Sequence, residues 1–126
     1  QVQVVKRMAI DLALPLEIIG IETVREVDGL ALSSRNRFLT ADERARAAIL
    51  PRTLRAALGA LADGRDAEPE LAARRAQLTQ AGFDVDYLAL VDGPTLAPIP
   101  RTQPNARLIT AARLGSVRLL DNMAAG

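Results

Sequence analysis

Apolar residues at the start of the chain follow a helical spacing. Val5, Met8 and Leu12 recur at helical intervals, and Pro15 pushes the residue before it out of the helical region. We therefore expect a helix within residues 1–14. Residues 16–21 read Leu-Glu-Ile-Ile-Gly-Ile, a short and almost wholly apolar run that is typical of a strand covered on both faces of a parallel sheet.

A buried parallel strand needs neighbouring strands, because its backbone donors and acceptors are otherwise unpaired. Nothing further along the chain repeats the pattern of a helix followed by a buried strand. We therefore expect residues 1–21 to be the tail of a larger α/β domain that lies upstream.

Periodicity disappears between Thr23 and Thr40, as expected of a loop that connects two domains. Thr40 and Glu43 then have the spacing of a capping box, which predicts a helix from about residue 41 that ends near Gly64. Pro51 should kink this helix because it removes one backbone hydrogen bond. The residues predicted to face a core are Ala48, Leu54, Leu58 and Leu61.

A second helix is predicted over residues 69–81, with Gly82 at the position where a left-handed C-cap costs least. Residues 83–91 begin with clean alternation and predict a strand. Residues 106–113 and 117–122 predict two more strands joined by a glycine-containing bend. The expected fold class is an α/β fragment, one helix plus one parallel strand, followed by a small α+β domain of two helices on a three-stranded, largely antiparallel sheet.

Composition excludes several kinds of chemistry. The chain has 126 residues with no Cys and no His, so disulfides, thiol nucleophiles, imidazole bases and thiolate or imidazole metal sites are excluded. A formal net charge of +1 does not indicate a nucleic-acid or membrane partner, and we expect a soluble, cytoplasmic protein. Lys6 is the sole lysine, and the other cations are arginines, whose planar fork suits phosphate and carboxylate.

The loop over residues 28–37 collects a glycine, two serines, an asparagine and two arginines just before a helix. Backbone amides and the hydroxyls of Ser33 and Ser34 can donate to phosphate oxygens, and Arg35 can follow charge that builds up in a transition state. The alternative is that the polar side chains make local turn hydrogen bonds while the arginines are solvated. Spacing alone leaves both interpretations open.

Other polar residues have simpler interpretations. Asp84 and Asp86 are predicted to be alternate, water-facing strand positions rather than a metal pair. Glu70 and Arg74 have the spacing of an exposed helical ion pair. Asp28 is expected to orient either Arg35 or its own loop. Asp121-Asn122 is interpreted as a turn former at a strand end.

The run Thr23-Val24-Arg25-Glu26-Val27-Asp28-Gly29-Leu30-Ala31-Leu32-Ser33-Ser34-Arg35-Asn36-Arg37 closely resembles the linker of the pantothenate synthetase family. The resemblance continues through Phe83-Asp84-Val85-Asp86-Tyr87-Leu88, Ala111-Ala112-Arg113-Leu114-Gly115 and Arg118-Leu119-Leu120-Asp121-Asn122, so it covers essentially the whole chain.

That family consists of ATP-dependent pantoate:β-alanine ligases. The resemblance implies a Rossmann-like nucleotidyltransferase domain that forms pantoyl adenylate from ATP and pantoate, and a small C-terminal lid over the site where β-alanine attacks. It also implies pantothenate, AMP and pyrophosphate as products and Mg²⁺ as the companion of ATP, held mainly by phosphates and water. The family's homodimer contacts lie mainly in the Rossmann-like domain.

Individual residues carry these implied roles. Leu32-Ser33-Ser34-Arg35 looks like the family's version of the KMSKS signature, so catalytic and ATP-phosphate contacts are expected from Ser33, Ser34 and Arg35, with Leu32 in the same loop. The main chain of Val24 is similar to the position that meets the adenine, and Gln1 looks like a glutamine that binds pantoate. No metal-ligating residue is expected.

The resemblance also has departures. The histidine pair that grips the ATP phosphates in this family is absent, as is the Gly-Glu-Lys-Asp stretch expected before Gln1. We therefore expect the chain to be the C-terminal portion of such an enzyme, divided as residues 1–24 (end of the Rossmann-like domain), 25–40 (linker) and 41–126 (lid), with little or no activity without its missing N-terminal catalytic half. The alternative from another class is a non-catalytic module that binds nucleotide or RNA phosphates; its low aromatic content speaks against RNA.

Overall fold

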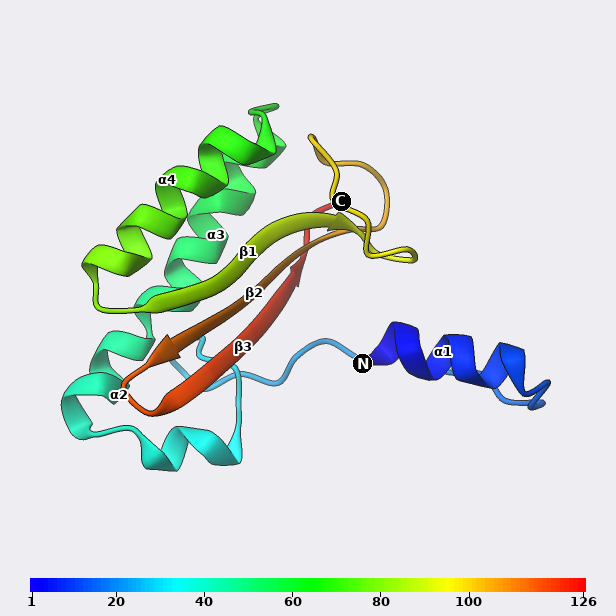
Figure 1. The fold of residues 1–126 in the computed structure, drawn as a ribbon, viewed down its shortest axis with the longest axis horizontal. Helices are drawn as coiled ribbons and strands as arrows, with labels where there is room; N and C mark the ends of the chain where they lie inside the picture. Colours follow the sequence, from blue (N-terminus) through cyan, green and yellow to red (C-terminus); the bar gives the residue numbers. More distant parts are fainter.

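The computed structural model describes all residues, 1–126. The chain forms four α-helices, one 3₁₀ helix and three β-strands (Figure 1). In chain order these are α1 (Val2–Asp11), η1 (Ser34–Phe38), α2 (Ala41–Ala47), α3 (Ile49–Ala62), α4 (Ala67–Gln80), β1 (Asp84–Asp92), β2 (Ala106–Leu114) and β3 (Val117–Ala124).

The three strands form one antiparallel sheet in the order β1-β2-β3. Helices α3 and α4 lie side by side on one face of it (Figure 1). A hydrophobic cluster of 20 buried residues fills the space between helices and sheet, and it draws leucines from both layers. The predicted small α+β domain with a three-stranded antiparallel sheet is therefore confirmed.

The start of α2 follows from local chemistry. The hydroxyl of Thr40 accepts from the backbone N–H of Glu43 at 3.2 Å, and the Glu43 carboxylate accepts from the backbone N–H of Thr40 at 2.9 Å. This is the predicted capping box. The predicted single kinked helix is instead two helices separated at Ala48, because Pro51 has no N–H to donate to the carbonyl of Ala47 and sits best in the first turn of α3.

The predicted hairpin with glycine at its bend is present, and because Leu114 pairs with Val117 the bend consists of Gly115 and Ser116 alone. Gly115 adopts a φ of 57°, which glycine reaches without steric cost. Strand β1 contains an irregularity at Asp86, where the register with β2 shifts between Val85 and Tyr87.

The N-terminal segment differs from the prediction. Helix α1 ends at Asp11 rather than near Pro15, and it stands apart from the sheet (Figure 1). The predicted parallel strand over residues 16–21 is not formed, and Ile19 and Ile21 are largely exposed. The physical reason is the absence of a partner, since no strand of the chain runs beside this segment and its backbone groups have none to pair with.

Candidate functional site

The predicted phosphate-binding loop is organised by a short reversal of the main chain. The N–H of Leu32 donates to the carbonyl of Val24 at 2.9 Å, and the N–H of Glu26 donates to the carbonyl of Leu30 at 2.8 Å. Gly29 sits at the turn with a φ of 90°, where a side chain would be strained and would collide with the guanidinium of Arg55. The reversal brings Val24 beside Leu32, two positions that lie apart in sequence.

Ser33, Ser34 and Arg35 follow this reversal directly and are all exposed. Ser33 caps η1, and its hydroxyl oxygen accepts from the backbone N–H of Arg35 at 3.2 Å. The local hydrogen bonding that was one interpretation of the loop is therefore present at Ser33. The guanidinium of Arg35 makes no hydrogen bond or ion pair, so its donors are available to an anion.

Asn36 stabilises the loop through its side chain. Its side-chain amide donates to the carbonyl of Ala31 at 3.0 Å, and the residue is buried. The side-chain oxygen of Asn36 is buried without a hydrogen-bond partner. Asn36 thus fixes the backbone immediately before Leu32, a role that the sequence pattern did not reveal.

An ion pair ties the loop to the sheet. Both terminal nitrogens of Arg25 donate to the carboxylate of Asp121 on β3, at 2.8 and 2.9 Å. Arg25 also donates to the carbonyls of Gly29 and Asn122. The hydrogen bond to Asp121 raises the pKa of Arg25 above its ordinary value, although partial burial opposes this.

The interpretation of Asp121-Asn122 as a turn former is therefore wrong. Both residues lie within β3, and Asp121 points to the same side of the strand as the buried Leu119 and Met123. A charged residue at an inward position of an alternating strand was the signal in the sequence, because a buried carboxylate needs a cationic partner.

A second ion pair settles the role of Asp28. Its carboxylate accepts from the guanidinium of Arg44 on α2 at 2.6 Å and from the backbone N–H of Leu30 at 3.2 Å. The hydrogen bond from Arg44 lowers the pKa of the Asp28 carboxyl below its ordinary value. Asp28 therefore orders its own loop and does not contact Arg35.

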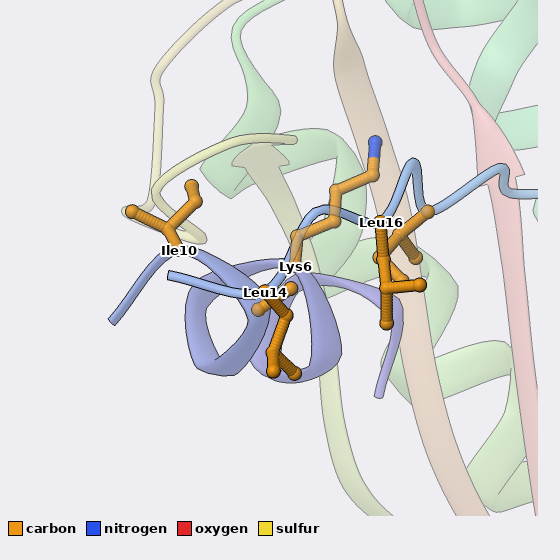
Figure 2. A pocket seen from close by; sticks show the side chains of 6 residues that line it. Lys6, Ile10, Leu14 and Leu16 are labelled. Atoms are coloured by element: carbon orange, nitrogen blue, oxygen red, sulfur yellow. The ribbon is translucent and has the colours of Figure 1, made fainter. Parts of the chain in front are cut away.

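No side-chain hydrogen bond joins Gln1 to this loop. It precedes the first residue of α1, and its side chain makes no capping hydrogen bond. The hollow beside α1 has a volume of about 220 Å³ and is lined mainly by apolar side chains (Figure 2). Figure 2 shows Ile10, Leu14 and Leu16 on its walls, with Lys6 as the one charged residue.

Most of the remaining polar candidates have structural partners. Asp86 pairs with Arg118 on β3 at 2.6 Å. Glu70 pairs with Arg74 as predicted, but the pair is not fully exposed because Glu70 is buried and also contacts Arg65. No group of three or more His, Cys, Asp or Glu residues is placed to hold a metal ion. None of the helices combines the length and apolar character needed to cross a membrane.

Comparison with known proteins places the whole chain in one family. The model of the pantoate-beta-alanine ligase family matches residues 1–124. A pantothenate synthetase of Acidiphilium cryptum is 55% identical over 98% of the chain, and one of Rhizorhabdus wittichii is 51% identical over 98%. The chain covers 45% and 44% of these two relatives, so it spans less than half of their length.

Solved structures agree with this result. A pantothenate synthetase from Thermus thermophilus superposes with a TM-score of 0.90 at 41% identity, over 98% of this chain and 45% of that one. A pantoate-beta-alanine ligase from Francisella tularensis, solved in complex with beta-gamma ATP and beta-alanine, gives a TM-score of 0.70 at 26% identity over 99% of this chain and 40% of that one.

Proposed function

The chain belongs to the pantoate-beta-alanine ligase family, and from this premise we propose that it supplies the phosphate-binding loop and the lid of an enzyme that condenses pantoate with β-alanine at the expense of ATP. The observation that carries the proposal is the exposed Ser33-Ser34-Arg35 segment, held in place by the main-chain bond between Leu32 and Val24. A relative of 26% identity binds ATP and beta-alanine, which supports the same ligands here.

The proposed reaction has two steps. A carboxylate oxygen of pantoate attacks the α-phosphorus of ATP, and pyrophosphate leaves. The amine of β-alanine then attacks the acyl carbon of pantoyl adenylate, AMP leaves, and the amine loses a proton. Pantothenate, AMP and pyrophosphate are the products.

The loop residues are assigned roles in the first step. The guanidinium of Arg35 donates to phosphate oxygens and offsets the negative charge that builds up as pyrophosphate departs. The hydroxyls of Ser33 and Ser34 donate to the same phosphates. The main chain of Val24, with Leu32 beside it, contacts the adenine end of ATP, and Gln1 contacts pantoate. Mg²⁺, as the companion of ATP, is proposed to be held mainly by phosphates and water.

The proposed division of the chain has residues 1–24 as the end of a Rossmann-like domain, 25–40 as the linker and 41–126 as the lid. The linker is proposed to move together with the lid, because Leu30 and Leu39 of the linker belong to the hydrophobic core of the lid. The exposed apolar side chains of α1 and of residues 16–21 support a larger domain that covers them. We propose that the complete enzyme is a cytoplasmic homodimer. We also propose that this chain needs the remaining portion of the enzyme for turnover, because positioning of the reactants alone can lower the barrier by roughly 7–11 kcal/mol.

A chimera tests the proposal. The corresponding C-terminal segment of the Acidiphilium cryptum synthetase, 55% identical to this chain, is replaced by residues 1–126, and pantothenate formation is measured. The proposal predicts an active chimera and a loss of activity on the order of 10²-fold or more in Arg35→Ala, with the circular dichroism spectrum unchanged.

Arg37→Ala is the matched control, because Arg37 is a neighbouring exposed arginine that stacks over Phe38 at 4.8 Å and is assigned no phosphate contact. A folded chimera without activity, or an Arg35→Ala chimera as active as the Arg37→Ala chimera, contradicts the proposal.

A further inference from the structure

A second hollow lies between η1 and the β2–β3 hairpin and has a volume of about 300 Å³. Three of the six residues that line it are arginines, and a serine adds a hydroxyl. The lining consists of Arg35, Phe38, Arg113, Ser116, Val117 and Arg118. This volume is at the small end of ligand pockets, which run from roughly 300 to 1,000 Å³, and it suits a compact ligand.

Two of these arginines face each other across the hairpin. Arg113 on β2 and Arg118 on β3 are direct cross-strand partners, one position before and after the pair that closes the bend. Like charges in directly opposed positions destabilise an antiparallel pair. The fold therefore holds two cations together at the mouth of the hollow, an arrangement that a bound anion would relieve.

The carboxylates near the hairpin offset this charge only in part, because Asp86 pairs with Arg118 and no carboxylate pairs with Arg113. Asp86 accepts only from the Nε of Arg118, at 2.6 Å, which leaves the two terminal nitrogens of that guanidinium without a partner. Asp84 is opposite Arg113 in the sheet but forms no ion pair with it. The carboxylate of Glu43 lies against the hairpin bend and accepts from a backbone N–H at the start of α2.

Three of the residues that line the hollow have donors without a partner in the fold. The guanidiniums of Arg35 and Arg113 make no hydrogen bond or ion pair, and the hydroxyl of Ser116 makes no hydrogen bond. A guanidinium offers a planar fork that matches phosphate oxygens, and charge-assisted bonds of this kind are stronger than neutral ones. We propose that Arg113, Ser116 and Arg118 form, together with Arg35, a binding site for a phosphate-class anion of the size of inorganic phosphate or diphosphate.

This site goes beyond the loop assigned above, because its main residues come from the β2–β3 hairpin and not from the segment before α2. Its ligand has two chemically equivalent sources, a free diphosphate or the triphosphate tail of a nucleotide. Only Arg35 is shared with the proposed ATP contacts.

The test is a titration of the ¹⁵N-labelled chain with sodium pyrophosphate, with ionic strength held constant by sodium chloride, followed through backbone amide and arginine Nε–H signals. We expect saturable shifts at residues 113–118 and at the Nε–H of Arg35. Arg113→Gln should weaken pyrophosphate binding about tenfold or more, because a charge-assisted contact is lost. Arg52→Ala is the control, since Arg52 is an exposed arginine of α3 without an ion pair, and it should leave the binding unchanged.

Competition by ATP with Mg²⁺ distinguishes the two sources. Displacement of pyrophosphate from the hairpin signals identifies a triphosphate tail as the ligand, and independent binding identifies a free anion. Equal shifts with sodium chloride alone, shifts confined to Ser33 and Ser34, or unchanged binding in a well-dispersed Arg113→Gln spectrum would overturn the inference.

The inference and the proposed function can fail separately. An inactive Arg35→Ala chimera without any hairpin shifts removes the hairpin site and leaves the ligase function. Hairpin shifts together with a fully active Arg35→Ala chimera remove the proposed role of the loop in the ligase reaction and leave the hairpin site.

Discussion

The ion pair between Arg25 and Asp121 predicts an asymmetric effect of two substitutions on stability. The side chain of Asp121 is 2% exposed and that of Arg25 is 20% exposed. Arg25→Met leaves a buried carboxylate with only the backbone N–H of Asn122 as a donor, whereas Asp121→Asn keeps an amide oxygen that Arg25 can still contact. Arg25→Met should therefore destabilise the chain more than Asp121→Asn.

The magnitudes follow from burial. Removing one partner of a fully buried ion pair costs about 3–5 kcal/mol, and the partial exposure of Arg25 places Arg25→Met at the lower end, about 3 kcal/mol. Asp121→Asn loses the charge but keeps the shape, and we expect about 1–2 kcal/mol. With roughly 4 °C per kcal/mol for a chain of this size, the expected falls in Tm are about 12 °C and about 6 °C.

The assay is urea unfolding followed by circular dichroism at 222 nm, because the chain has one Tyr and no Trp to serve as a fluorescence probe. The double variant Arg25→Met with Asp121→Leu should recover most of the loss, since it removes both charges from the site. Equal costs below about 0.5 kcal/mol for both single variants, or a larger cost for Asp121→Asn, would refute the reasoning.

Three other predictions concern the loop and its supports. Asp28 has a lowered pKa in the folded chain, so its pairing with Arg44 should contribute its full stabilisation at pH values above the ordinary aspartate pKa of about 4. The difference in unfolding free energy between the unsubstituted chain and Asp28→Asn should shrink as the pH falls through the lower folded pKa. A difference that grows on acidification contradicts this prediction. Thr40→Ala should lower the unfolding free energy by about 1 kcal/mol, because the cap on Glu43 is lost; no change in the urea midpoint would count against the cap. Leu30→Ala should cost about 2–5 kcal/mol, and a surface-like cost below about 0.5 kcal/mol would show that the linker does not belong to the core.

Elements with local signals could be predicted from the sequence. The capping box at Thr40 is carried by residues three positions apart. Gly82, with a φ of 93°, ends the second predicted helix as glycine does after many helices. Gly115 marks the hairpin bend in the same way. In each case a few neighbouring residues determine the backbone conformation, so the local pattern is sufficient.

Elements that depend on distant partners could not be predicted in this way. Residues 16–21 have a strand-like composition, but a strand forms only beside another one. Glu70 has the spacing of a surface ion pair, yet the fold buries it against Arg74 and Arg65. Its burial depends on how α4 packs, which the spacing of charges along the helix does not report.

The candidate site likewise has a part with a local sequence signal and a part that depends on distant residues. The segment Ser33-Ser34-Arg35 is a candidate from the sequence because its polar residues are contiguous, and its role follows from the family resemblance. Its anchor is not contiguous, since Arg25 and Asp121 are 96 positions apart in the chain. The cluster of Arg35 with the hairpin arginines likewise exists only after β2 and β3 pair and η1 packs against them.

Exchange of labelled pyrophosphate into ATP, dependent on pantoate, measures the first step of the proposed reaction and tests most directly whether this chain supplies the phosphate contacts. It is measured on the chimera that carries residues 1–126, with Arg35→Ala and Arg37→Ala as the matched pair. The account predicts exchange in the unsubstituted chimera and in Arg37→Ala, and a loss on the order of 10²-fold or more in Arg35→Ala. Exchange in Arg35→Ala at the rate of the unsubstituted chimera would contradict it.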